Sequence, residues 1–225
     1  MSIAPALPSA SVILMRDGTQ SPEILLVQRN TKVSFHGGSW VFPGGKVDQN
    51  DAVGLAQDDD MAIARRAGER EVEEEAGLRI DGASLIPFSH WTTPENQPKR
   101  FAAWFFIGTV PSADVVTVDG SEIVDHQWVT VGEALEQRFR NDIALAPPAF
   151  VSLLRIREFR DAADILAYVA ESGVERYSPR VVELDGGRCS VYSEDVAYDS
   201  LDLTVSGPRH RLRMLKNGWQ YISRY

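Results

Sequence analysis

The sequence predicts an α+β fold, in which a β-sheet is flanked by helices. Short apolar runs typical of buried strands are mixed along the chain with segments whose apolar residues recur at helical spacing. Turn residues separate these segments, and no internal repeat is present. At 225 residues the chain can bury a full core without disulfide bonds, so one large domain, or one domain with an extension, is expected.

Strands are predicted where a short apolar run ends at a turn. In order, they cover residues 11–15, 23–28, 40–42, 84–91, 101–110 and 123–131. Asp17-Gly18 and Asp119-Gly120 mark turns, and Pro43-Gly44-Gly45 must end the third run. Residues 48–60 are polar and rich in aspartate, which predicts an exposed loop.

A charge-dense helix is predicted over residues 61–76. The aspartates at 58–60 suit its first turn because carboxylates satisfy free backbone N–H groups, and Gly77 suits a left-handed stop. Small residues recur at every fourth position: Ala64, Gly68, Val72 and Ala76. Glycine inside a helix costs about 1 kcal/mol relative to alanine, so we expect Gly68 to permit very close packing of this helix on the sheet.

The later part of the chain is predicted to contain helices and then short strands. The helices cover residues 132–140, 150–159 and 162–170. In the β-type tail, Gly186-Gly187 and Asn217-Gly218 are hairpin turns. Arg209, Arg211 and Arg213 alternate with His210, Leu212 and Met214, which predicts a strand with one solvated basic face. A surface for phosphate or an acidic partner is the alternative.

Three glutamates share one face of the charge-dense helix. Glu71, Glu74 and Glu75 are three and four residues apart, so their carboxylates project together and repel one another unless a divalent cation lies between them. Hard oxygen ligands favour Mg²⁺, Mn²⁺ or Ca²⁺ over Zn²⁺. The sequence therefore predicts a site for cations that handle phosphates; a solvated, charged helix face is the alternative.

Composition limits the compartment and the partners. The chain has 23 Lys and Arg against 32 Asp and Glu, a net charge of −9, so an anionic substrate would need cations to mediate its binding. No apolar run approaches the roughly 18–20 residues that span a membrane. The single cysteine, Cys189, suits a reducing compartment. We expect a cytoplasmic protein with no membrane partner.

The residues around the glutamates resemble the sequence box of the Nudix hydrolases. Arg70, Glu71, Val72, Glu74, Glu75, Gly77 and Leu78 fill its second half, Arg-Glu-aliphatic-x-Glu-Glu-x-Gly-aliphatic, and Gly45 fills its leading glycine. The resemblance implies a Nudix fold over residues 1–140, a mixed sheet sandwiched between helices (α/β/α). It implies hydrolysis of a nucleoside diphosphate linked to another group. Residues 141–225 would be a C-terminal extension, two helices and then short strands, packed on the Nudix domain.

Two features depart from the family pattern. Residues 46–69 separate Gly45 from Arg70, which is more than the family spacing, so an insertion is predicted at residues 48–60. The family's intermediate glutamate would fall eight residues before Arg70, where this chain has Ala62. The supporting role of that glutamate is therefore either absent or taken by an aspartate of the insertion.

The resemblance also implies roles for single residues. The predicted ligands of Mg²⁺ or Mn²⁺ are Glu71, Glu74, Glu75 and the backbone carbonyl of Gly44. Arg70 can pair with Glu74 one turn on and so fix the carboxylates. The general base is either a glutamate of the box, with Glu74 and Glu75 as candidates, or Glu122 on a later loop, and the sequence does not choose between them.

A finer resemblance concerns the substrate. Residues 25–29, Gly38 and residues 42–45 follow the spacing of a motif in coenzyme A diphosphatases of this family. Val27, Asn30 and Ser34 depart from the usual residues of that motif. Residues 90–94, Arg100-Phe101 and the β-type tail are similar to a peroxisomal-type subgroup. Coenzyme A or acyl-coenzyme A is the favoured substrate, and ADP-ribose or a dinucleotide is the alternative.

Four residues are candidates for substrate binding: Arg29, Gly45, Lys99 and Arg100. An arginine that ends a strand can bind phosphate or be a plain surface charge. Lys99 and Arg100 could equally protect the edge of a strand.

A different class of function is a Nudix-derived regulator that binds a nucleotide and, through its tail, nucleic acid. Residues 141–225 carry 11 basic against 12 acidic residues, so nucleic acid is not expected as a partner. The expected partner is a small nucleotide-type substrate. A homodimer formed through the tail is compatible with either class.

Overall fold

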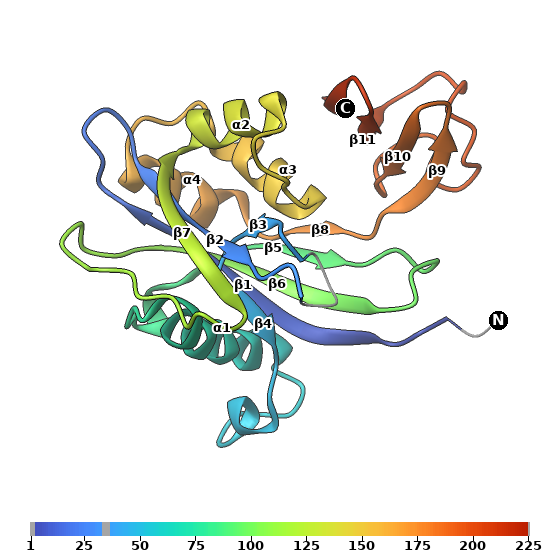
Figure 1. Cartoon of the computed structure of the whole chain (residues 1–225). Helices are drawn as coiled ribbons and strands as arrows, with labels where there is room; N and C mark the ends of the chain where they lie inside the picture. Colours follow the sequence, from blue (N-terminus) through green and yellow to red (C-terminus); the bar gives the residue numbers. More distant parts are fainter. Residues whose placement is uncertain (1–2, 33–36, 225) are drawn as a thin grey trace. The chain divides into compact units, whose positions relative to one another are not determined.

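A computed structural model describes residues 3–32 and 37–224 (Figure 1). Its strands are β1 (Ala6–Arg16), β2 (Glu23–Arg29), β3 (Trp40–Val41), β4 (Gly44–Lys46), β5 (Ile86–Thr92), β6 (Arg100–Thr109), β7 (Ile123–Thr130), β8 (Glu175–Tyr177), β9 (Arg180–Leu184), β10 (Gly187–Val191), β11 (Arg209–Leu215) and β12 (Gly218–Arg224). Its α-helices are α1 (Asp60–Ala76), α2 (Val131–Arg140), α3 (Pro147–Ile156) and α4 (Ala162–Ser172), with short 3-10 helices η1 (Gln49–Ala52) and η2 (Gly82–Ser84).

The chain divides into two compact units. The larger unit comprises Leu7–His90 and Ala103–Glu175, and the smaller unit comprises Met1–Ala6, Trp91–Ala102 and Arg176–Tyr225. Helices α3 and α4 therefore belong to the larger unit, and strands β9 to β12 to the smaller one. The predicted division at residue 140, with an extension packed on the first domain, stays a prediction.

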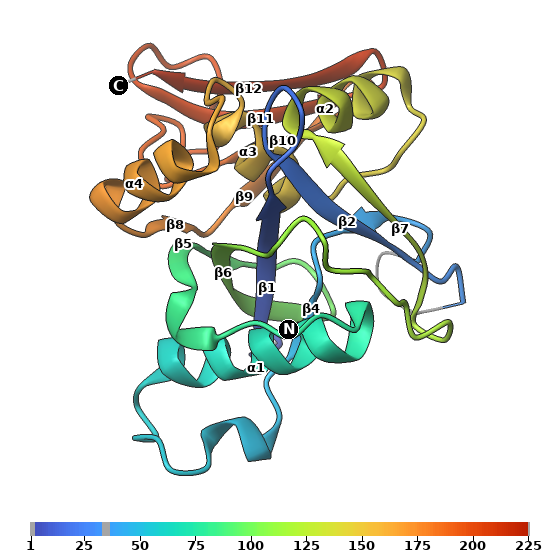
Figure 2. The same cartoon turned by 90° about the vertical axis from the view of Figure 1, so that its left-hand side faces the viewer.

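The larger unit is built around a mixed sheet with helices on both faces. The sheet has the strand order β3-β2-β1-β6-β5, with β4 paired to β1 and β7 paired to β2. Helix α1 covers one face, and α2, α3 and α4 lie on the other (Figures 1 and 2). The core between α1 and the sheet contains residues such as Val12, Val72 and Phe106, all at 0% exposure. The predicted α+β class and the α/β/α arrangement are confirmed.

Helix α1 is the element that carries the candidate site. Asp59 caps its start, because its carboxylate accepts a hydrogen bond from the backbone N–H of Ala62 at 3.0 Å. Gly77 ends it with φ of 67°. A Cβ built on Gly68 would lie 2.8 Å from a methyl group of Val12 on β1, so the glycine lets the helix approach the sheet closely. The predicted helix, its stop and its close packing are confirmed.

Replacing Gly77 by alanine is expected to lower the free energy of unfolding by about 2 kcal/mol. About half of this loss comes from placing a Cβ in the left-handed region, and the rest from the backbone carbonyl of Thr117, which would lie 3.1 Å from the new Cβ. Gly54→Ala is a matched control, because Gly54 has φ of 78° with nothing within 4 Å of its Cβ position. Urea unfolding should show a larger loss of unfolding free energy for Gly77→Ala than for Gly54→Ala. Equal losses would show that the close approach of Thr117 adds no cost.

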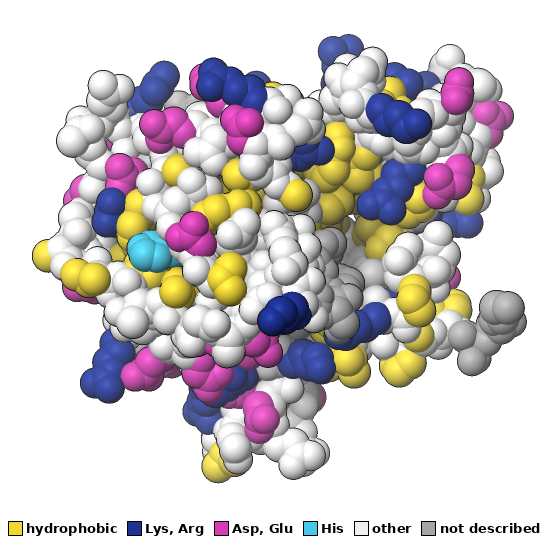
Figure 3. Space-filling model, in the orientation of Figure 1, with side chains coloured by type: hydrophobic (Ala, Val, Ile, Leu, Met, Phe, Trp, Pro, Cys, Tyr) yellow, Lys and Arg dark blue, Asp and Glu magenta, His cyan; other side chains and the backbone are white. Residues whose placement is uncertain are grey.

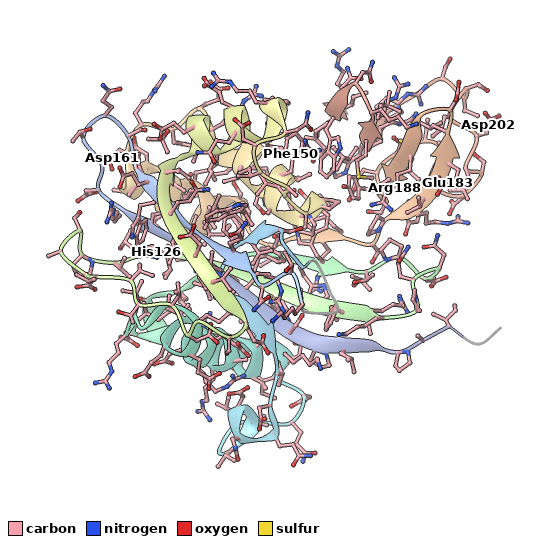
Figure 4. The ribbon with its side chains drawn as sticks, viewed as in Figure 1. His126, Phe150, Asp161, Glu183, Arg188 and Asp202 are labelled. Carbon is pink, nitrogen blue, oxygen red and sulfur yellow. The ribbon has the colours of Figure 1, made fainter. Side chains whose placement is uncertain are left out.

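Some elements differ from the predicted bounds for local reasons. Strand β1 begins at Ala6 rather than at residue 11, since its first half pairs with β4, as in Ser9↔Lys46. Helix α3 begins at Pro147 rather than at residue 150, because proline suits the first helical position, where no N–H partner is needed. Helix α4 starts at Ala162 as predicted, after Asp161 (Figure 4), whose carboxylate accepts a hydrogen bond from the N–H of Ala163 at 2.7 Å, and it ends at Ser172 rather than at residue 170.

The insertion at residues 48–60 is not a plain exposed loop. It contains η1 (Gln49–Ala52), whose start is stabilised by a capping box: the Asp48 carboxylate accepts from the backbone N–H of Asp51, and the Asp51 carboxylate accepts from the backbone N–H of Asp48. Asp51 of η1 is 3% exposed. The prediction of an exposed loop is therefore wrong for Asp51, because this carboxylate is turned towards α1, as described below.

The smaller unit contains an antiparallel sheet with the strand order β12-β11-β10-β9. Its hairpin turns are Asp185-Gly186 and Lys216-Asn217, one residue before the predicted Gly186-Gly187 and Asn217-Gly218, because Gly187 and Gly218 already pair as the first residues of β10 and β12. Arg188 and Glu183 lie opposite each other on β10 and β9 (Figure 4). The predicted solvated basic face is wrong for Arg211, which is buried and forms an ion pair with Asp195. Within the described residues, no helix has the length and apolar character needed to cross a membrane.

Candidate active site

The candidate site lies in the larger unit, where the second half of α1 meets β4, the end of β2 and the loop that precedes β7. Acidic and basic side chains gather side by side over this region of the molecular surface (Figure 3).

Glu75 is the buried carboxylate of the site, with its side chain 6% exposed. Its Oε2 accepts a hydrogen bond from the backbone N–H of Gly44 at 2.8 Å, which ties α1 to β4. Burial raises the pKa of Glu75 to about 8; the carboxylates of Glu71 and Glu122 add to the rise, while the Gly44 N–H and Arg29 oppose it. Glu75 is thus a carboxylate held in a place where its charge needs compensation.

The Gly44-Gly45 pair lets two other elements come close. A Cβ on Gly44 would lie 2.3 Å from the carbonyl oxygen of Ala10, because β4 runs directly against β1 here. A Cβ on Gly45 would lie 2.3 Å from Oε1 and 2.6 Å from Oε2 of Glu71. Glycine at position 45 therefore makes the room that the Glu71 carboxylate occupies.

Arg70 connects the carboxylates to one another. Its Nη1 donates to Glu71 Oε1 and to Glu74 Oε2, each at 2.9 Å, and its Nη2 donates to the carbonyl of Lys46 at 3.0 Å. The predicted pairing of Arg70 with Glu74 is present. The remaining donors of Arg70 contact Asp51, a residue that sequence reasoning left unassigned among the aspartates of the insertion.

Glu71 is partly buried, and Glu74 is more exposed. Burial raises the pKa of Glu71; the charge of Arg70 opposes this, and the carboxylates of Glu74 and Glu122 add to it. The side chain of Glu74 is 58% exposed and contacts Arg70 at the rim of the site.

Arg29, at the end of β2, lies between two acidic groups without forming a close hydrogen bond to either. Its Nη1 is 3.9 Å from Glu75 Oε1, and its Nη2 is 3.6 Å from Glu122 Oε2. Its Nε is buried and, within the described part of the chain, has no hydrogen-bond partner. Buried donors without acceptors are costly, so this guanidinium can take a further anionic group.

The loop that carries Glu122 is held by Asp119. One oxygen of Asp119 accepts from the N–H of Glu122 at 2.9 Å, and the other from the N–H of Ile123 at 2.8 Å. The N–H of Asn30 donates to the carbonyl of Glu122 at 2.7 Å, which joins the loop to β2. Sequence reasoning marked only a turn at Asp119-Gly120; the Asp-Gly-Ser run was the available signal for this role.

Two predicted substrate-binding residues belong to the smaller unit. Arg100 donates from Nε to the carbonyl of Thr93 at 3.1 Å and from Nη1 to the carbonyl of Ala4 at 2.7 Å. Lys99 lies with its Nζ 5.5 Å from the centre of the Phe101 ring. Their role in substrate binding stays a prediction. Ser34, which departs from the coenzyme A motif, lies outside the described residues.

The predicted metal ligands Glu71 and Glu74 are occupied by Arg70. Among the residues that the structure describes, no three acidic, histidine or cysteine side chains are arranged as a finished metal site. The donor set nevertheless fits a hard divalent cation, because the carboxylates of Glu71 and Glu122 lie near enough to Glu75 to add to the rise of its pKa, and Gly45 makes room for the Glu71 carboxylate.

The family model described as NUDIX domain matches residues 5–149 of the chain. The chain belongs to the Nudix family. The family that the resemblance at residues 70–78 and Gly45 predicted is thereby confirmed. The crystal structure of a NUDIX hydrolase from Alicyclobacillus acidocaldarius shares the fold, with a TM-score of 0.65 at 20% identity, and the match covers 74% of this chain and 97% of that one.

Two curated proteins of the family are similar in sequence to the chain. Putative nudix hydrolase 7 of Caenorhabditis elegans is 26% identical over 188 residues, which cover 68% of this chain and 61% of that protein. Human acyl-coenzyme A diphosphatase NUDT19 is 27% identical over 147 residues, which cover 61% of this chain and 39% of that protein. The chain thus spans less than two thirds of the length of these Nudix relatives.

Proposed function

We propose that this Nudix protein is a pyrophosphohydrolase that depends on Mg²⁺ or Mn²⁺ and cleaves a nucleoside diphosphate linked to another group. The observation that carries the proposal is the crowding of Glu71, Glu75 and Glu122 around the Gly44-Gly45 turn and Arg29: burial raises the pKa of Glu71 and Glu75, and the neighbouring carboxylates add to the rise. Such an arrangement costs stability without a cation and gains from one. Family membership supplies the reaction class.

The residues of the chain would divide the work as follows. A bound divalent cation would supply neutralisation of the phosphate charge and a lower pKa of an attacking water. Arg70 orients Glu71 and Glu74, and the N–H of Gly44 orients Glu75. The proton of the water would pass to a box glutamate, Glu74 or Glu75, or to Glu122, and the proposal leaves these open.

Arg29 is the group that would hold the negative charge of the substrate. Its guanidinium already faces the site between Glu75 and Glu122 at distances beyond a hydrogen bond. Its buried Nε lacks a partner among the described residues. A phosphate oxygen would satisfy these donors with charge-assisted hydrogen bonds.

Coenzyme A or acyl-coenzyme A is the substrate that we favour. The motif at residues 25–29 and 42–45 supports it, together with the similarity to a human acyl-coenzyme A diphosphatase. ADP-ribose and dinucleotides are the alternatives within the same reaction. The predicted cytoplasmic location and homodimer stay predictions.

A substrate panel tests this function. The protein is incubated with Mg²⁺ or Mn²⁺ and coenzyme A, acetyl-coenzyme A, ADP-ribose, NADH or diadenosine polyphosphates, and the products are separated by chromatography. We expect phosphopantetheine or its acyl form from the first two, and no product when EDTA is present. Faster cleavage of ADP-ribose or a dinucleotide would reject coenzyme A as the preferred substrate. If none of these compounds is cleaved, the proposed pyrophosphohydrolase activity is rejected.

A further inference from the structure

One face of the four-stranded sheet in the smaller unit collects arginines. In the register of β11 and β12, Arg209 lies opposite Arg224, and Arg213 lies opposite Gln220. Residues that lie directly opposite each other project from the same face, and side chains alternate between faces along a strand. Arg209, Arg211, Arg213 and Arg224 therefore share one face of the sheet, which we call the arginine face.

The arginine face has little negative charge to compensate it. Within the described residues of β9 to β12, no acidic residue has a register position on this face. Asp195, from the segment after β10, forms an ion pair with Arg211. Among the described residues, no such ion pair is formed by Arg209, Arg213 or Arg224. In a chain with a net charge of −9, this face is thus a local excess of positive charge.

The opposite face of the same sheet shows the usual arrangement of charges. There Arg188 on β10 lies directly opposite Glu183 on β9, and Figure 4 labels both residues. Opposite charges across neighbouring strands stabilise a sheet, and like charges directly opposite each other destabilise it. The pair Arg209 and Arg224 is therefore unfavourable by itself, and it would become favourable with an anion bound between the two side chains.

Arg209 also has a donor without an acceptor. Its Nη2 donates to the backbone carbonyl of Val205, which holds the guanidinium on one side. Its Nη1 is buried and, among the described residues, has no hydrogen-bond partner. A buried donor that makes no hydrogen bond costs free energy. An oxyanion beside this guanidinium would remove that cost and would also compensate the charge of Arg224.

The spacing of the arginines selects the size and charge of the anion. Directly opposite residues have Cβ atoms about 4.5–5.5 Å apart, so Arg209 and Arg224 can both reach one tetrahedral group. Two guanidiniums match the two charges of a phosphate group, whose oxygens suit their planar forks. Arg213 is four residues along β11 from Arg209, about 13 Å away, so it adds to the positive field without contacting the same phosphate.

We propose that Arg209 and Arg224 form a binding site for a dianionic phosphate group, either inorganic phosphate or the phosphomonoester of a small metabolite. The site recognises this group and makes or breaks no bond. It is independent of the proposed function, because none of its residues belongs to the candidate active site.

Phosphate titration of the full chain in EDTA tests the proposal. Inorganic phosphate and ethyl phosphate are added separately at an ionic strength held constant with sodium chloride, and the arginine Nε–H signals are followed by NMR. We expect saturable shifts of the Arg209 and Arg224 signals, which the single variants assign. Arg224→Gln should weaken the binding about 10-fold or more. The control Arg188→Gln, on the opposite face, should stay within about twofold of wild type.

Thermal unfolding separates a binding role from a structural one. Without phosphate, Arg224→Gln removes a like-charge pair, so its thermal midpoint should equal or exceed that of the wild type. With phosphate, the midpoint of the wild type should rise more than that of the variant, because a ligand stabilises the state that binds it. This comparison needs only Arg224→Gln, so it holds even if Arg209→Gln, which also loses the bond to Val205, folds poorly.

Three results would overturn the proposal: no saturable shift of the Arg209 and Arg224 signals with either compound, unchanged phosphate affinity in Arg224→Gln, or an equal loss of affinity in Arg188→Gln. Tighter binding of one compound than of the other supports the site and identifies the source of the phosphate group. The outcome of the substrate panel has no bearing on these measurements, since EDTA is present throughout.

Discussion

Glu75→Gln is expected to lower turnover by about 10³-fold or more. Loss of a general base alone costs 10²- to 10⁴-fold, and Glu75 is also a predicted metal ligand. The fold should persist, because the amide oxygen of glutamine can still accept the hydrogen bond that the Gly44 N–H now donates to Glu75 Oε2 at 2.8 Å. The measurement is kcat with saturating Mn²⁺ on whichever substrate the panel identifies.

The control for this variant lies on the same helix. Glu73→Gln removes the same charge two residues away, but Glu73 is 54% exposed and pairs with Arg79 at the surface. Surface pairs of this kind contribute little, so Glu73→Gln should retain turnover. Wild-type turnover in Glu75→Gln, or an equal loss in Glu73→Gln, would refute the assignment of Glu75.

Glu75→Gln should also raise the free energy of unfolding of the metal-free protein at high pH. The pKa of Glu75 is raised from 4.5 to about 8 in the folded state, mainly by burial, so its ionisation favours the unfolded chain. Wild-type stability is therefore lost as the pH rises from about 4.5 to 8, and glutamine has no such loss. Since one pKa unit corresponds to about 1.4 kcal/mol, thermal unfolding in EDTA should show a gain of a few kcal/mol at pH 8 and none at pH 4. A pH-independent difference would contradict the raised pKa.

Gly45→Ala should impair the site while leaving the fold intact. The new Cβ would lie within 2.3–2.6 Å of the Glu71 carboxylate, and this flexible end of a side chain can turn away at little cost to folding. Glu71 would then leave Arg70 Nη1, so Mn²⁺ affinity and kcat should each fall about 10- to 100-fold. Mn²⁺ titration and kcat are measured beside the thermal midpoint.

Two other glycines calibrate this prediction. At Gly132 the nearest atom to a built Cβ is Thr130 Oγ1 at 4.0 Å, so Gly132→Ala should leave both activity and fold unchanged. At Gly44 the Cβ would meet the backbone oxygen of Ala10 at 2.3 Å, so Gly44→Ala should lower stability as well as activity. Full activity in Gly45→Ala would show that catalysis does not require the Glu71 carboxylate to lie against position 45.

Local features of the sequence predicted the elements that local interactions determine. Helix α1 could be placed because its aspartate cap, its stop at Gly77 and its small-residue stripe all lie within one segment. The shared face of Glu71, Glu74 and Glu75 followed from helical spacing, and Arg70 from the resemblance to the Nudix box. Even Gly68 could be interpreted, because a glycine inside a good helix needs a packing reason, and Val12 of β1 provides it.

Contacts between distant segments could not be predicted in the same way. The burial of Asp51 depends on where Arg66 and Arg70 project from α1, which the local sequence of residues 48–60 does not show. The backbone contact between Gly44 and Ala10 depends on the pairing of β4 with β1. Arg211 was mistaken for a solvated residue because its partner, Asp195, is 16 positions away.

The contact between Asp51 in the 48–60 insertion and Arg70 on α1 affects how related sequences can be recognised. A pattern that demands a glutamate eight residues before Arg70 would find Ala62 there and miss this chain. The chain instead has Asp48-Gln49-Asn50-Asp51, a capped turn whose last carboxylate reaches Arg70 from outside the helix. A pattern that admits a variable gap, with an aspartate-capped turn inside it, would retain such chains. Their missing glutamate is then no sign of a lost site.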